Sequence, residues 1–212
     1  MYFVKTPAWL KKIYHNYVWH IPTREKVVYL TFDDGPHPEA TPFVLKELKK
    51  FDAKATFFCI GKNVIAEPEI YEKILIEGHS AGNHTHNHLN GWKSSNDIYI
   101  DNIHKAAGVI ESKLFRPPYG RIKKIQGRKL KEKGFEIIMW DVLSGDFDTG
   151  ITPEKCYKNV ADNAVPGSVI VFHDSEKAFK NMSHALPKIL HLLSGKGYRF
   201  EAISNCDDKR RA

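Results

Sequence analysis

The stretch Val27-Val28-Tyr29-Leu30-Thr31-Phe32-Asp33-Asp34-Gly35-Pro36 joins a hydrophobic run to two adjacent carboxylates and a Gly-Pro turn. The apolar run predicts a strand, and Gly35-Pro36 turns the backbone directly after it. Asp33 and Asp34 are therefore expected at the end of a strand. Because neighbouring side chains of a strand point to opposite faces, one acid can bind a metal ion while the other acts as a base. Taken alone, two acids before Gly-Pro are more typical of a turn.

Apolar runs alternate with amphipathic helical stretches along the rest of the chain. The predicted strands are 27–32, 55–60, 80–82, 114–116, 135–140, 169–172 and 200–203. The predicted helices are 42–51, 69–77, 98–113, 125–133, 154–163 and 186–195. About seven β/α units in 212 residues predict an α/β fold, and favour a single-domain barrel over an open doubly wound sheet. We take residues 27–204 as this domain.

The lead segment, residues 1–26, carries a short helical pattern. Trp9, Ile13 and Tyr17 are spaced four residues apart, and lysines lie nearby. The segment is expected to pack on the barrel; the alternative is that it rests on a membrane surface. It contains no recognisable signal peptide, so the cytoplasm or the inner membrane surface is the expected location. Residues 205–212 form a basic tail that we expect to be solvated.

Composition places the chain among soluble globular proteins, with 42% hydrophobic and 27% charged residues. Charged residues interrupt every apolar run well before the about 20 residues that a membrane-spanning helix needs. The net charge of +7 is weakly attractive to polyanions, but the basic residues are scattered, and no nucleic-acid partner is expected. Three widely spaced cysteines, Cys59, Cys156 and Cys206, favour reduced thiols.

Polar clusters follow five of the predicted strands. They are Asp33-Asp34, residues 84–88, residues 116–120, residues 144–146 and His173-Asp174. In a parallel barrel the carboxyl ends of the strands share one rim, where function is built. The sequence therefore predicts one site assembled from these clusters.

Three histidines in five residues indicate a metal site. His84 and His88 have the spacing that places two imidazoles on one face of a helical turn. In an extended segment His86 would point the same way and be a rival ligand. With Asp34 as the third ligand, the set suits catalytic zinc, and equally a ferrous or other divalent ion.

Hydrolysis at such a metal also needs a base and an acid. Asp33, beside the presumed ligand Asp34, is the natural base, and His173 at a strand end is the natural acid. Arg116 can hold Asp33 ionised through its planar fork. A ferrous oxygenase is the alternative for two histidines and one carboxylate, but Asp33 and His173 make hydrolysis the better interpretation.

Four ordered motifs carry a family resemblance: Thr31-Phe32-Asp33-Asp34-Gly35, His84-Thr85-His86-Asn87-His88, Arg116-Pro117-Pro118-Tyr119-Gly120 and Val171-Phe172-His173. Together they resemble the polysaccharide deacetylase family, which is carbohydrate esterase family 4 or the NodB homology domain, over about residues 27–204. The resemblance implies a distorted β/α barrel and metal-dependent removal of acetyl groups from N-acetylated sugars.

The resemblance also implies a role for each matching position. Asp33 would be the base, His173 the acid, and Arg116 would position Asp33. The backbone N–H of Tyr119 would stabilise the oxyanion, and Val171 would line the pocket for the acetyl methyl. One divalent ion, zinc first with cobalt, nickel or ferrous iron as alternatives, would be held by Asp34, His84 and His88.

The fourth family motif departs from its pattern at Leu143 and Phe147, where the resemblance leads us to expect Asp and Trp. The missing Asp is the residue expected to tune His173. Asp141 or Asp174 could substitute, or His173 could act without a charge partner. We therefore expect an active enzyme with an altered pH optimum, and keep a non-catalytic, metal-containing carbohydrate-binding module as the alternative.

Overall fold

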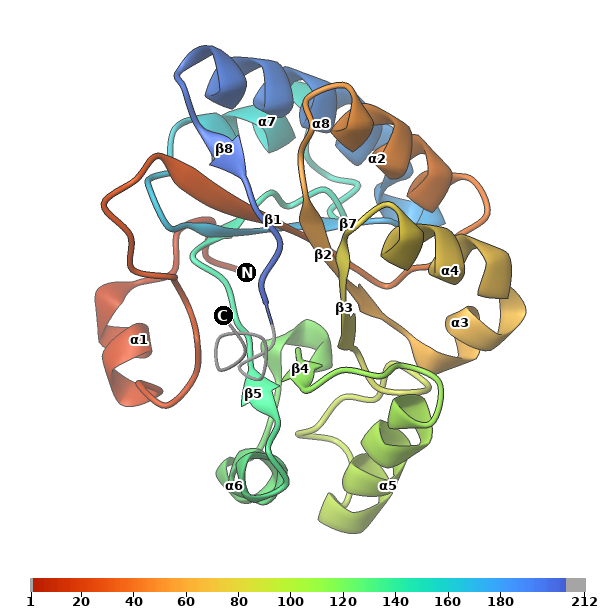
Figure 1. Ribbon diagram of the computed structural model, residues 1–212. Coiled ribbons are helices and arrows are strands. Elements are labelled where there is room, and N and C mark those ends of the chain that lie inside the picture. The colour runs from red at the N-terminus through yellow and green to blue at the C-terminus, as the bar shows by residue number, and fades with distance from the viewer. Residues whose placement is uncertain (1, 205–212) are drawn as a thin grey trace.

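The computed structural model describes residues 2–204 as a curled, incompletely closed barrel of parallel strands with helices on its outer face (Figure 1). The strand order is β5-β4-β3-β2-β1-β7-β6, and β8 pairs with β1 beside this path. The strands are β1 (Val27–Asp33), β2 (Ala55–Cys59), β3 (Ser80–Asn83), β4 (Leu114–Phe115), β5 (Glu136–Ile137), β6 (Val142–Leu143), β7 (Val169–His173) and β8 (Arg199–Phe200). The expected distorted (β/α) barrel is confirmed.

All but the first of the helices lie in the connections between parallel strands, as crossovers of this kind require, and α1 precedes β1. They are α1 (Ala8–Ile13), α2 (Ala40–Lys49), α3 (Gly61–Ala66), α4 (Pro68–Ile76), α5 (Asn96–Ala107), α6 (Lys124–Glu132), α7 (Pro153–Ala161) and α8 (Glu176–Gly195). None of these described helices is both long enough and apolar enough to cross a bilayer.

Strand β1 is an interior strand of the sheet and lies between β2 and β7. Alternate side chains of β1 face two environments. Phe32 packs against Phe57 and Phe172 in the core under the helices, with ring centroids 5.1 and 6.1 Å away. Asp33 lies at the level of His173 in the neighbouring strand and faces the inside of the barrel. The alternation of side chains along β1 thus places the Asp33 carboxylate at the inner rim of the barrel.

The lead segment spans the opening between the edge strands β5 and β6. Near one edge, Val18 N donates to Ile137 O at 2.9 Å, and near the other Leu143 N donates to Val4 O at 2.8 Å. The Lys5 ammonium lies 2.6 Å from the buried carboxylate of Asp141, which Lys11 also contacts. These contacts cover backbone edges that would otherwise be unpaired.

The predicted strand 135–140 is wrong in its second half. β5 ends at Ile137, and a separate strand, β6, follows at Val142. The carbonyl oxygens of Ile138 and Met139 instead accept hydrogen bonds from the side chain of Arg116. A long-range contact with a buried cation therefore interrupts a segment whose hydrophobicity reads as one strand.

Two helices also differ from their predicted ranges. α8 begins at Glu176, ten residues before the expected start, and contains Pro187 in its interior. α5 ends at Ala107 rather than continuing to 113, and α3 was not predicted. The basic tail, 205–212, and Cys206 lie outside the described residues, while Cys59 and Cys156 are buried free thiols.

Candidate active site

A fully buried ion pair joins the end of β1 to the loop after β4. Arg116 Nη1 lies 2.7 Å from Asp33 Oδ1, and neither side chain is more than about 5% exposed. The same guanidinium donates to Thr31 Oγ1, Ile138 O and Met139 O, and lies 4.1 Å from the centroid of the Phe58 ring. Arg116 thereby orients Asp33 and supplies the positive charge that two adjacent carboxylates need.

Asp34, His84 and His88 offer ligand atoms that all lie within 4.8 Å of one another. Asp34 Oδ1 is 3.1 Å from His88 Nε2 and 3.6 Å from His84 Nε2. This oxygen is buried, yet no described group donates it a well-formed hydrogen bond. These three residues, here called the cation cluster because they could surround a metal ion, therefore fit a divalent cation. Such an ion would satisfy the carboxylate oxygen and both imidazoles.

The protonation of these residues also suits metal binding. Burial is the main cause that lowers the pKa of His84 to about 4, so its imidazole is neutral near pH 7. His84 Nδ1 lies 2.8 Å from Arg116 O, which leaves Nε2 for a ligand. Burial alone would raise the pKa of Asp34, but the neighbouring His88, His173 and His84 hold it well below its ordinary value.

Unusual backbone conformations gather at this site. Among the described residues other than glycine, five have a positive φ, and Asp52 is the one that lies elsewhere. The other four belong to the site loops: Asp34 (81°), Thr85 (64°), His88 (56°) and Tyr119 (61°). Left-handed backbone is unfavourable for these residue types, and its concentration in one place is typical of a functional site.

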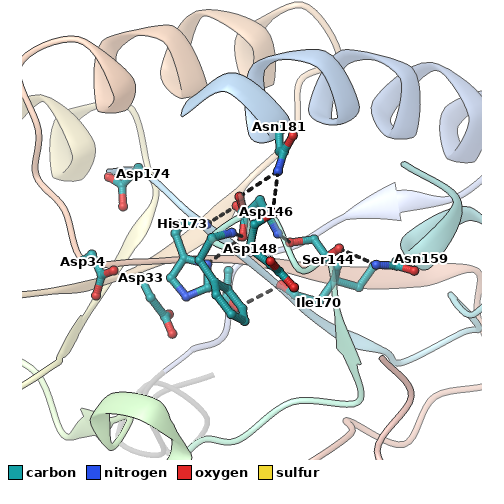
Figure 2. Close-up of polar contacts among 12 residues, drawn as sticks. Asp33, Asp34, Ser144, Asp146, Asp148, Asn159, Ile170, His173, Asp174 and Asn181 are labelled. Carbon is teal, nitrogen blue, oxygen red and sulfur yellow. Dashed lines mark hydrogen bonds and ion pairs between the residues drawn. The ribbon is translucent and has the colours of Figure 1, made fainter. Parts of the chain in front are cut away.

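His173, the last residue of β7, is paired with Asp146 (Figure 2). Its Nδ1 lies 2.7 Å from Asp146 Oδ1, and its backbone N–H donates to Asp146 Oδ2 at 2.6 Å. Burial tends to lower the pKa of His173, but the Asp146 carboxylate outweighs it and raises the pKa to about 9. His173 is therefore a cationic acid near neutral pH, with Nε2 free to donate.

Two asparagines hold the loop that carries Asp146 (Figure 2). Asn181 of α8 donates from Nδ2 to both Asp146 O and Asp148 O, each at 3.1 Å. Asn159 of α7 donates to Ser144 O at 2.8 Å. These bonds satisfy carbonyl groups of a loop without a strand partner and fix the carboxylate beside His173.

The base, acid and metal-ligand candidates line one cavity of about 460 Å³, and the side chains that support them lie behind its wall. Asp33 and His173 both border it, together with the three residues of the cation cluster. Val171 and Leu143 add apolar wall, and the ring of Tyr119 packs on His88 at 4.6 Å. The cavity thus combines a cation cluster, a carboxylate, a cationic acid and an apolar surface.

Comparisons with known proteins agree on the family. The model of the family described as "Polysaccharide deacetylase" matches residues 20–138. A peptidoglycan-N-acetylglucosamine deacetylase of Bacillus cereus is 38% identical over 194 residues, covering 88% of this chain and 90% of the relative. This chain belongs to the polysaccharide deacetylase family. A crystal structure of the peptidoglycan N-acetylglucosamine deacetylase Bc1960 superposes with a TM-score of 0.86 at 36% identity, covering 93% of this deacetylase-family chain and 95% of the other.

One structural neighbour in the polysaccharide deacetylase family bears on activity. The crystal structure of BA3943 from Bacillus anthracis is described as that of a pseudoenzyme. It has a TM-score of 0.77 and 25% identity, and covers 87% of this chain and 66% of the other. Family membership by itself therefore fixes the fold without fixing catalysis.

The structure corrects the expectation for the fourth motif of this polysaccharide deacetylase. Neither proposed substitute faces His173: Asp141 pairs with Lys5 and Lys11, and Asp174 accepts from Thr41 Oγ1 and Gly35 N. Asp146 is the charge partner of His173, so His173 does not need an aspartate at the position of Leu143. Leu143 therefore gives no reason to expect an altered pH optimum.

The structure also decides between the histidines. Residues 84–88 are neither helical nor extended, because Thr85 and His88 have left-handed backbone. His86 lies outside the cation cluster, and its Nδ1 packs so close to Gly61 that a Cβ there would be 2.7 Å away. The remaining predicted residues converge on the cavity. The supporting Asn159 and Asn181 were missed, since no local pattern distinguishes them from other helix residues.

Proposed function

We propose that this chain is a metal-dependent hydrolase that removes acetyl groups from N-acetylated sugars, such as N-acetylglucosamine residues of a glycan or glycoconjugate. One observation supports the proposal: three groups of residues reach the same cavity. They are the cation cluster, the Asp33–Arg116 pair and the Asp146–His173 pair. The names of its relatives support the same reaction class.

Asp34, His84 and His88 would hold the metal ion. When bound, such an ion polarises an amide carbonyl and makes a water molecule more acidic. Zinc suits two imidazoles and one carboxylate with open positions, and cobalt, nickel and ferrous iron share that preference.

The protein's own side chains would then accept and donate the protons of the reaction. Asp33, oriented by the hydrogen bond that it accepts from Arg116 Nη1, takes a proton from the attacking water. His173 Nε2 donates a proton to the departing amine, while Asp146 stabilises the imidazolium. Val171 offers a small apolar wall to the acetyl methyl, and the backbone N–H of Tyr119 is the proposed donor to the oxyanion. The products are acetate and a free amino sugar.

The alternative is a carbohydrate-binding module that keeps the fold without the reaction. A pseudoenzyme among the structural neighbours makes this alternative concrete. The acid and base pairs argue against it here, since a buried Arg–Asp pair and a raised histidine pKa serve no purpose in sugar binding alone.

Metal removal is the first test of the proposed function. Stripping the metal with a chelator is expected to abolish acetate release from a panel of N-acetylated saccharides, and zinc, cobalt, nickel or ferrous iron should restore it. Release by thoroughly stripped protein would contradict metal dependence. No release from any saccharide, with one metal equivalent bound, would instead favour the binding module.

A second prediction concerns the acid. In Asp146→Asn, burial still lowers the pKa of His173, whereas the carboxylate that raises it most is gone and only the more weakly acting Asp34 and Asp33 remain. His173 therefore loses its proton at lower pH, and the alkaline limb of the pH–rate profile should shift to lower pH by about one pH unit or more. Asp148→Asn is the matched control, because Asp148 lies in the same loop and bonds to Tyr2. Identical alkaline limbs in both variants would contradict the role of Asp146.

Location and membrane contact stay predictions. Trp9 and Ile13 on α1 are more than half exposed, which is compatible with the alternative that the lead segment rests on a membrane surface.

A further inference from the structure

The lead segment reaches the cavity that the base and the acid line, here called the catalytic cavity. Lys5 lies opposite Val142 of β6 in an antiparallel bridge. Because the two segments run in opposite directions, residues before Lys5 lie toward the carboxyl end of β6. Tyr2 accordingly lines the catalytic cavity, as His173 does. A residue from outside the predicted barrel domain, 27–204, therefore contributes to the wall of this cavity.

Tyr2 is fixed against the loop that carries Asp146. Its hydroxyl donates to Asp148 Oδ2 at 2.9 Å, and its ring centroid lies 5.2 Å from that of Phe147. Gly145, with a φ of 78°, leaves the space for the hydroxyl, because a Cβ at this position would lie 2.8 Å from the hydroxyl oxygen. A hydrogen bond and a ring contact thus hold the Tyr2 side chain to this loop.

Phe147 connects Tyr2 to the acid. The Phe147 ring and the His173 imidazole are in a T-shaped arrangement, with centroids 5.1 Å apart and an interplanar angle of 72°. The backbone N–H of Phe147 donates at 3.0 Å to Asp146 Oδ1, the oxygen that lies 2.7 Å from His173 Nδ1. The position of Phe147 therefore affects both the plane of the imidazole and the carboxylate that holds it.

We propose that Tyr2 is a positioning residue for the acid. By packing on Phe147 and binding Asp148, Tyr2 limits the movement of the loop, so that His173 Nε2 keeps the orientation it needs to protonate the departing amine. The inference rests on the proposed function and deepens it, because it gives the lead segment a part in proton donation.

The test compares two substrates whose leaving groups differ in their need for a proton. When the amide C–N bond of an N-acetylated saccharide breaks, the amine takes a proton from His173 Nε2, whereas 4-nitrophenyl acetate releases a stable phenolate anion without one. Tyr2→Ala should lower kcat for tetra-N-acetylchitotetraose about tenfold, a fraction of what a positioned acid contributes. It should change kcat/KM for 4-nitrophenyl acetate by less than about twofold, because that leaving group needs no acid.

The chain offers two control variants. Tyr2→Phe keeps the ring on Phe147 and loses only the hydroxyl, so it should recover most of the kcat. Phe3, the next residue, is 54% exposed and does not line the catalytic cavity, so Phe3→Ala should leave both rates at their wild-type values. Three results would overturn the proposal: equal losses on both substrates in Tyr2→Ala, no loss on either, or the same selective loss in Phe3→Ala.

Nuclear magnetic resonance separates this proposal from the proposed function, because it needs no turnover. The His173 Nδ1 proton, held by Asp146, should give a downfield signal that is absent in His173→Gln. Faster exchange with water should weaken this signal in Tyr2→Ala but not in Phe3→Ala. A weakened signal without deacetylation of any saccharide would keep Tyr2 as a positioning residue and refute the proposed reaction. Equal signals in the wild type and Tyr2→Ala would refute the role of Tyr2.

Discussion

Asp33→Asn is expected to lower the rate of acetate release by about 10²–10⁴-fold, the usual contribution of a positioned base. The amide cannot take a proton, yet its oxygen can still accept the hydrogen bond from Arg116 Nη1 that Asp33 Oδ1 accepts now. Metal binding should persist, because the atoms that would hold the ion belong to Asp34, His84 and His88. Acetate release at saturating substrate and metal content by elemental analysis check the two halves of this expectation.

Asp34→Asn is the informative comparison, because the two acids are neighbours of similar chemistry. It should lose metal as well as activity, whereas Asp33→Asn should lose activity alone. Activity of Asp33→Asn within tenfold of the wild type would refute Asp33 as the base. Loss of metal from it would indicate that the two carboxylates do not have separate tasks.

Arg116→Met is expected to lower the free energy of unfolding by about 3–5 kcal/mol, because it leaves a buried carboxylate without its partner. Asp33 is only 4% exposed, and Thr31 and two backbone carbonyls would lose their donors as well. For a chain of this size, the melting temperature should fall by roughly 6–20 °C. Thermal and denaturant unfolding at one pH measure the change.

Arg128→Met provides the control for removing an arginine. Arg128 is 70% exposed and lies 3.9 Å from Glu132, so its loss should change stability by less than about 1 kcal/mol. The double variant Asp33→Leu with Arg116→Met should recover part of the loss, because no buried charge remains. Equal melting temperatures for Arg116→Met and Arg128→Met would contradict a stabilising buried pair.

Together, these variants divide the catalytic cavity into parts with different signatures. Asp33 should affect rate without metal loss, Arg116 should affect stability, and Asp146 should move the alkaline limb. A module that only binds carbohydrate would still lose stability in Arg116→Met. It would release no acetate, so no pH–rate profile could be measured for it.

The sequence by itself determined the fold class and most of the residues that line the candidate site. Strand runs and helical periodicity are local properties, and their alternation suffices to predict parallel β/α units. Each predicted site residue lies next to a predicted strand end, so the shared rim of a parallel barrel brings them together. Asp33, Asp34 and His173 could thus be assigned before any contact was known.

Only the tertiary structure decided which groups support them. The partner of His173 is 27 residues away in sequence, and two other aspartates were equally plausible from spacing. Left-handed backbone at Thr85 and His88, which periodicity does not reveal, selects His88 over His86. The buried Arg116 binds the carbonyl groups of Ile138 and Met139, where β5 has already ended, and the lead segment closes the opening between β5 and β6. These outcomes depend on contacts between distant segments, whereas a sequence pattern records only the preferences of neighbouring residues.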